Sequence, residues 1–82
     1  MTKLPLVSSK VLVAALERDG FHPKRKSKGG SHQTFCKDLP DGRVLVTVVV
    51  LGKREIPRGT LASILRRAEI SHDKFLNLLR GQ

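Results

Sequence analysis

The feature that most constrains this chain is an unbroken apolar run, VLVTVVVL, over residues 44–51. Most of its residues are β-branched, and such residues fit a pleated strand better than a helix. The preceding Asp41-Gly42 pair is a turn signal, because Asp-Gly readily supplies a positive φ. Residues 32–37, before that turn, alternate well enough for a second strand. The sequence therefore predicts a hairpin whose later strand covers residues 43–51.

Alternation along this later strand divides its side chains between two faces of a sheet. The even-numbered residues share one face, which we expect to bury against helices: Val44, Val46, Val48 and Val50. The odd-numbered residues form the other face, which is still largely apolar: Leu45, Thr47, Val49 and Leu51. So short a chain has few helices to cover both faces. The second face is therefore either a docking surface for a protein partner or a purely structural hydrophobic face.

A helix is predicted before the hairpin. Ser8 is a good N-cap, because its hydroxyl can accept from the free amides of the first turn. Leu12, Ala15 and Leu16 then form one apolar stripe. Residues 17–19 are charged, and we expect them to face water.

The remaining elements complete the predicted order. Residues 21–26 form a short basic stretch whose Pro23 restricts it to an edge strand. After the hairpin, a second helix over residues 60–68 carries apolar side chains at i, i+3, i+4 and i+7. Ser71 caps a last short helix. We predict one α+β domain over residues 1–82, ordered α-β-β-β-α with a short final helix.

Composition narrows the classes of protein that fit. One cysteine, Cys36, excludes an internal disulfide framework and a four-thiolate zinc site, and it fits a reducing compartment. We interpret it as a small core residue rather than a nucleophile. No apolar run is long enough to span a membrane. The apolar start of the chain runs directly into charged residues, which argues against a signal peptide. We expect a cytoplasmic protein that is a monomer when free.

Positive charge is the first functional signal. The chain carries 16 Lys and Arg against 7 Asp and Glu, a formal net charge of +9. Such a charge on a small domain points to a polyanion or an acidic partner, with a solvated basic surface as the plain alternative. Three Phe and no Tyr or Trp argue against aromatic platforms for single-stranded bases. The residues that we expect to contact the phosphates of a nucleic acid are Lys24, Arg25, Lys26, Lys28, Gly30, Ser31, Arg43, Lys53 and Arg54.

His32 is the second signal, because it opens a strand beside the densest basic cluster. A neutral imidazole can take the proton from a ribose 2′-hydroxyl, and an imidazolium can protonate a leaving oxygen. A histidine near basic residues also serves as a phosphate contact or is a bystander, so the residues alone leave these roles open. We interpret His22 and His72 as surface residues, and no spacing among the histidines indicates a metal site. Asp38 and Asp41 flank the turn, where Asp is favoured for turn chemistry.

Several short motifs, taken in their order and spacing, resemble the HicA family of toxins from bacterial and archaeal toxin–antitoxin pairs. They are Gly30-Ser31-His32, Asp41-Gly42, Val46-Thr47-Val48, Glu55-Ile56, Gly59-Thr60-Leu61, Ser63-Ile64-Leu65, and Ile70-Ser71 followed by Phe75. The similarity covers nearly the whole chain. Many relatives carry a second histidine where this chain has Gln33, a Pro and then a His where it has residues 49–51, and a glycine where it has Glu69.

The resemblance implies a double-stranded-RNA-binding-like fold, with helices packed on one face of a three-stranded antiparallel sheet. It also implies ribonuclease activity on messenger RNA and neutralisation by a HicB antitoxin, and it places the family's catalytic histidine on His32. We therefore predict a metal-independent endoribonuclease without a cofactor, in a prokaryotic cytoplasm. Two alternatives stay open: a non-catalytic double-stranded RNA-binding module, and an interaction protein whose basic face serves an acidic partner.

Overall fold

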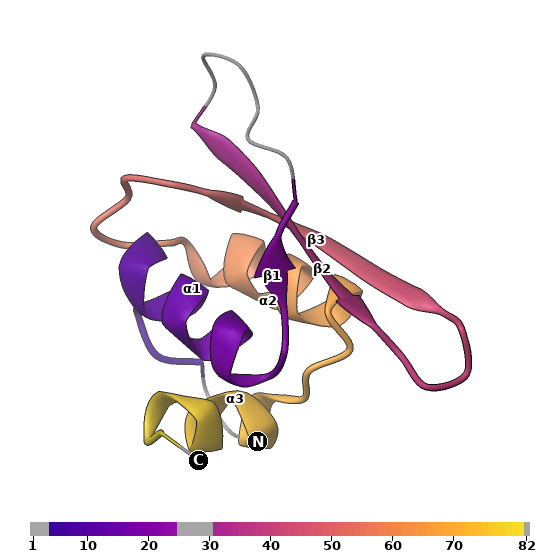
Figure 1. Ribbon diagram of the computed structural model, residues 1–82. Helices are drawn as coiled ribbons and strands as arrows, with labels where there is room; N and C mark the ends of the chain where they lie inside the picture. The colour runs from indigo at the N-terminus through magenta and orange to yellow at the C-terminus, as the bar shows by residue number, and fades with distance from the viewer. Residues whose placement is uncertain (1–3, 25–30, 82) are drawn as a thin grey trace.

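The computed structural model describes residues 4–24 and 31–81. Its elements in chain order are α1 (Ser9–Arg18), β1 (His22–Pro23), β2 (His32–Asp38), β3 (Val44–Val50), α2 (Arg58–Arg67) and α3 (His72–Leu79). This order confirms the predicted α+β fold with its extra C-terminal helix. Figure 1 shows α1 and α2 beneath the sheet, with α3 under α1 and away from the strands.

The three strands form one antiparallel sheet in the order β1-β2-β3. His22 lies opposite Cys36, and His32 lies opposite Val50. β1 is the edge strand that Pro23 predicted. The turn between β2 and β3 is also as predicted, because Gly42 has φ 90° and its N–H donates to the Leu39 carbonyl at 3.0 Å.

The faces of β3 are the reverse of the prediction. Thr47 and Val49 are fully buried at 0% exposure, whereas Val44 and Val46 are 54% and 43% exposed. The reason is the register with β2, which places Phe35 opposite Thr47. Because Phe35 is the largest apolar side chain of the hairpin and only 2% exposed, its face becomes the core face.

Of the two interpretations of the odd-numbered face, the purely structural hydrophobic face is confirmed and the docking surface is wrong. The helices of the same chain cover that face, and Leu45 and Leu51 pack against the core cluster to which Val49 belongs. The Thr47 hydroxyl is satisfied there, because it donates to the Ile64 carbonyl of α2 at 2.9 Å. The apolar side chains of β3 that are left in water, Val44 and Val46, belong to the even-numbered face.

The helix boundaries follow local chemistry. The Ser8 hydroxyl accepts from the Val11 N–H at 3.2 Å, and the Ser71 hydroxyl accepts from the Lys74 N–H at 3.1 Å. α2 begins at Arg58, two residues before the predicted start, directly after Pro57 in the N-cap position. The predicted apolar stripes of α1 and α2 are buried: Leu12, Ala15, Leu16, Leu61, Ile64, Leu65 and Ala68.

One predicted water-facing residue, Asp19, instead joins three elements. Its side chain is only 6% exposed and forms ion pairs with Lys37 of β2 at 3.2 Å and Lys74 of α3 at 2.8 Å. The neighbouring Arg18 guanidinium donates to the Leu78 carbonyl at 2.8 Å. The end of α1 is thus fastened to the last helix of the chain. Among the described residues, no helix has the length and apolar character needed to cross a bilayer.

Candidate functional site

His32 is the first residue of β2, and its exposed side chain lines a pocket of about 190 Å³ at the β3 edge of the sheet. The opposite wall of this pocket comes from α2. We call it the His32 pocket and define it by its lining: His32, Thr47, Val48, Thr60, Ser63, Ile64 and Arg67.

The wall residues of α2 lie on one face of that helix. Thr60, Ser63 and Arg67 are spaced i, i+3 and i+7, which places them in one row. All three are exposed. The Thr47 hydroxyl bond to the Ile64 carbonyl holds the middle of α2 against β3 at this place. The fold therefore brings an imidazole, two hydroxyls and a guanidinium to one surface hollow.

His32 was predicted from the sequence, but its neighbours in the pocket were not. Arg67 was not among the residues predicted to contact RNA, and Thr60 and Ser63 appeared only as parts of short motifs. Their i, i+3, i+7 row beside the apolar stripe of α2 was visible in the sequence. What was not visible is that this row faces His32, because that depends on how α2 packs on β3.

Four of the residues predicted to contact RNA lie toward the His32 end of the sheet. The Lys24 N–H donates to the Thr34 carbonyl at 2.8 Å, and the Ser31 carbonyl accepts from the Leu51 N–H at 2.6 Å. Lys53 and Arg54 follow β3 in an exposed loop at the same end. None of the four lines the His32 pocket itself. Arg25, Lys26, Lys28 and Gly30 lie outside the described residues.

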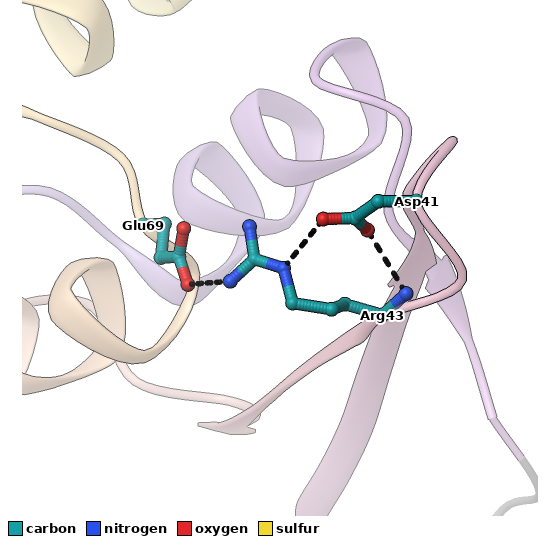
Figure 2. A network of polar contacts seen from close by, with 3 residues as sticks. All are labelled: Asp41, Arg43 and Glu69. Carbon is teal, nitrogen blue, oxygen red and sulfur yellow. Dashed lines mark hydrogen bonds and ion pairs between the residues drawn. The ribbon is translucent and has the colours of Figure 1, made fainter.

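Arg43 lies at the opposite end of the hairpin. Six residue steps of strand, about 20 Å, separate Val44 beside it from Val50 beside His32. Its guanidinium pairs with Asp41 at 2.9 Å and Glu69 at 3.3 Å, as Figure 2 shows. The structure does not bring Arg43 to the His32 pocket.

The electrostatics of this turn are set by Arg43. Its backbone N–H donates to Asp41 Oδ1 at 3.0 Å, and this bond, with the guanidinium, holds the pKa of Asp41 below its ordinary value of 3.8. The carboxylate in turn raises the pKa of Arg43 above its ordinary value. Both groups therefore stay charged and paired at neutral pH, so two carboxylates already offset the Arg43 charge.

Cys36 is buried at 7% exposure, as predicted, but not in the main core. It lies on the outer face of the sheet beneath His22, whose ring nitrogens are 3.7 and 3.8 Å from its Sγ. Across residues 4–24 and 31–81, no group of three or more His, Cys, Asp or Glu side chains could hold a metal ion.

Two departures from the usual HicA pattern have structural roles. The Gln33 side chain is buried on the core side, where its Nε2 donates to the Lys24 carbonyl at 2.6 Å and to the Thr34 carbonyl at 3.0 Å. It fixes β1 to β2. Glu69 has φ 54°, a left-handed conformation that favours glycine, and it is the one non-glycine residue of the described chain with positive φ.

These observations define a small, strongly basic α+β domain with an imidazole pocket between its sheet edge and a helix. The family model described as the HicA toxin of bacterial toxin–antitoxin systems matches residues 9–70, most of the chain. The chain therefore belongs to this family: it is a toxin of a toxin–antitoxin system, and such a toxin has an antitoxin partner. Toxins of this family are generally ribonucleases. No curated protein sequence matches the chain.

Proposed function

We propose that this chain is an endoribonuclease that cleaves messenger RNA, with His32 as general base, and that a HicB-type antitoxin neutralises it. The observation that carries the proposal is the His32 pocket, in which an exposed imidazole faces Arg67 and two hydroxyls. An imidazole supplies the base, and a guanidinium supplies fixed positive charge for a phosphate. Family membership supports the same chemistry.

The proposed reaction is an internal transfer at one phosphate. The His32 imidazole removes the proton of the 2′-hydroxyl, and the resulting oxygen attacks the adjacent phosphorus. The bond from phosphorus to the 5′-oxygen breaks, and that oxygen takes a proton from solvent. The products are a 2′,3′-cyclic phosphate and a new 5′-hydroxyl end. Arg67 offsets the charge that builds on the phosphate oxygens.

Basic residues near the His32 end of the sheet would hold the RNA backbone. Lys24, Lys53 and Arg54 lie there, and Ser31 precedes His32 in the chain. Arg25, Lys26, Lys28 and Gly30 stay proposed RNA contacts outside the described residues. Such phosphate contacts give affinity without sequence information, and their strength falls as salt rises. Arg43 would act only as a distant contact, because it lies about 20 Å along the strand.

The test is cleavage of a labelled RNA in EDTA by wild-type protein and His32→Ala, with analysis of the product ends. We expect the variant to lose on the order of 10² to 10⁴-fold in rate and to keep RNA binding, because a positioned base contributes about that much. His22→Ala is the matched control, since His22 is also exposed but lies outside the pocket. Full cleavage by His32→Ala would remove the assignment. Intact RNA binding with no cleavage by wild type would favour the non-catalytic binding module.

Arg66 and Arg67 provide a second matched pair. Both are exposed in the last turn of α2, but only Arg67 lines the His32 pocket. We expect Arg67→Gln to lower the cleavage rate on the order of 10²-fold, and Arg66→Gln to change it little. Equal effects of the two variants would mean that Arg67 contributes only general positive charge.

The cellular setting follows from the same proposal. Messenger RNA and the antitoxin are the proposed partners, and the proposed site of action is the prokaryotic cytoplasm. The proposed reaction uses no metal ion, so activity should persist in EDTA.

A further inference from the structure

The second hollow of interest lies between the start of α1 and the loop that follows β3. It encloses about 650 Å³, and Figure 1 shows that loop passing the first turn of α1. We call it the α1 groove. Its apolar floor is Val13, Ala14 and Leu51. Its volume is within the range of ordinary binding sites.

The α1 groove has a fixed shape because one buried serine joins its two sides. Ser9 is 3% exposed, and its hydroxyl donates to the Val50 carbonyl at 2.6 Å and accepts from the Lys53 N–H at 3.0 Å. The Ser9 N–H also donates to the Lys53 carbonyl at 2.9 Å. Through this one residue, α1 is bound to the end of β3 by one hydrogen bond and to the loop by two. A ligand would meet a preformed hollow and would not have to order it.

The charges around the apolar floor are unbalanced. Lys10, Lys53 and Arg54 line the groove, against the single carboxylate of Glu17. An apolar side chain flanked by carboxylates is complementary to such a site. A nucleobase is a poorer match, because none of the described residues that line the groove is aromatic and could stack on it.

The α1 groove shares no lining residue with the His32 pocket. The groove is built from α1 and the loop after β3, whereas the pocket is built from β2, β3 and α2. A protein bound in the groove thus contacts none of the residues that line the His32 pocket, but it meets Lys53 and Arg54, which the proposed function also assigns to the RNA backbone.

We propose that the α1 groove is an anchoring site for the antitoxin, which inserts an apolar side chain from an acidic segment. The toxin–antitoxin relationship supplies the partner, and the charge and apolar floor of the groove supply its chemistry. The inference rests on that relationship and not on the proposed cleavage chemistry. Contacts at the groove bind the antitoxin whether or not the antitoxin also covers the His32 pocket.

The test measures binding of the purified cognate antitoxin to wild-type protein, Ala14→Glu and Val11→Glu by titration calorimetry. Ala14 lies on the groove floor, whereas Val11 is 43% exposed on the same helix and does not line the groove. Both variants add the same charge to α1. We expect Ala14→Glu to weaken binding at least about tenfold, and Val11→Glu to leave it unchanged. Lys53→Glu should also weaken binding, and thermal unfolding of each variant shows that it is folded.

Cleavage of the labelled RNA by the same variants separates this proposal from the proposed function. Ala14→Glu should cut RNA like wild type and resist the antitoxin. The groove proposal is overturned if Ala14→Glu binds the antitoxin with wild-type affinity. It is also overturned if Ala14→Glu loses RNA binding while its antitoxin affinity stays intact. If neither wild-type protein nor any variant cuts RNA, the proposed function fails. The calorimetry still shows whether the antitoxin binds at the α1 groove.

Discussion

Thr47→Val tests the orientation of β3 directly. Thr47 is fully buried, and its hydroxyl donates to the Ile64 carbonyl at 2.9 Å. That carbonyl also accepts from the Ala68 N–H at 3.1 Å, so the substitution leaves no orphaned acceptor. The expected loss is therefore that of one neutral hydrogen bond, about 1 kcal/mol. For a domain of this size, such a loss lowers the Tm by roughly 4–8 °C.

Thr34→Val is the matched control for this prediction. Thr34 lies opposite Val48, on the outer face of the same hairpin, and is only half-buried. Valine fits a strand as well as threonine does, so we expect a Tm change of less than about 2 °C. The assay is thermal unfolding of wild-type protein and both variants, followed by far-ultraviolet circular dichroism in one buffer.

Two results would refute the reasoning about Thr47. If Thr47→Val unfolds at the wild-type temperature, the hydroxyl is not buried against α2. If Thr34→Val loses as much stability as Thr47→Val, the two faces of the hairpin are equally covered. The orientation expected from alternation alone, with Thr47 outside the helix-covered face, corresponds to the first result.

Two further predictions concern the contacts in Figure 2. Glu69→Gly should raise the Tm by a few degrees. Glycine relieves the strain of the left-handed conformation, about 1–2 kcal/mol, which exceeds the stabilisation from the half-exposed ion pair with Arg43. A lower Tm of this variant in thermal unfolding would show that the ion pair contributes more. Asp41→Asn should lower the Tm at neutral pH, since the lowered pKa of Asp41 means that its ionised form stabilises the fold. That stabilisation is complete above about pH 4 and is lost as the pH falls through the lowered pKa, so a Tm difference that persists in strong acid would contradict it.

The sequence was most informative where structure depends on neighbours in the chain. The caps at Ser8 and Ser71 need only the next few amides, and the turn at Gly42 needs only a positive φ. The buried face of β3 could not be predicted from chain neighbours in this way, because both faces of the strand are apolar. Only the pairing with β2, which places Phe35 opposite Thr47, decides which face meets the helices.

The same distinction applies to the candidate site. His32 was found through a local motif with flanking basic residues, and its exposure fits the proposed role. Arg67 was missed because its position depends on packing between α2 and β3, which are separated in the chain by a loop. The α1 groove was missed for a similar reason, since Ser9 reaches the backbone of Val50 and Lys53 far along the chain.

The attachment of α3 to the end of α1 has a consequence for the timing of synthesis. Phe75 and Leu78 belong to the buried core, and Asp19 and Arg18 bind Lys74 and the Leu78 carbonyl. The chain is made from its N-terminus, so the first helix waits for the last before the core can close. Until translation has passed α3, the surface of α1 that α3 covers stays in water.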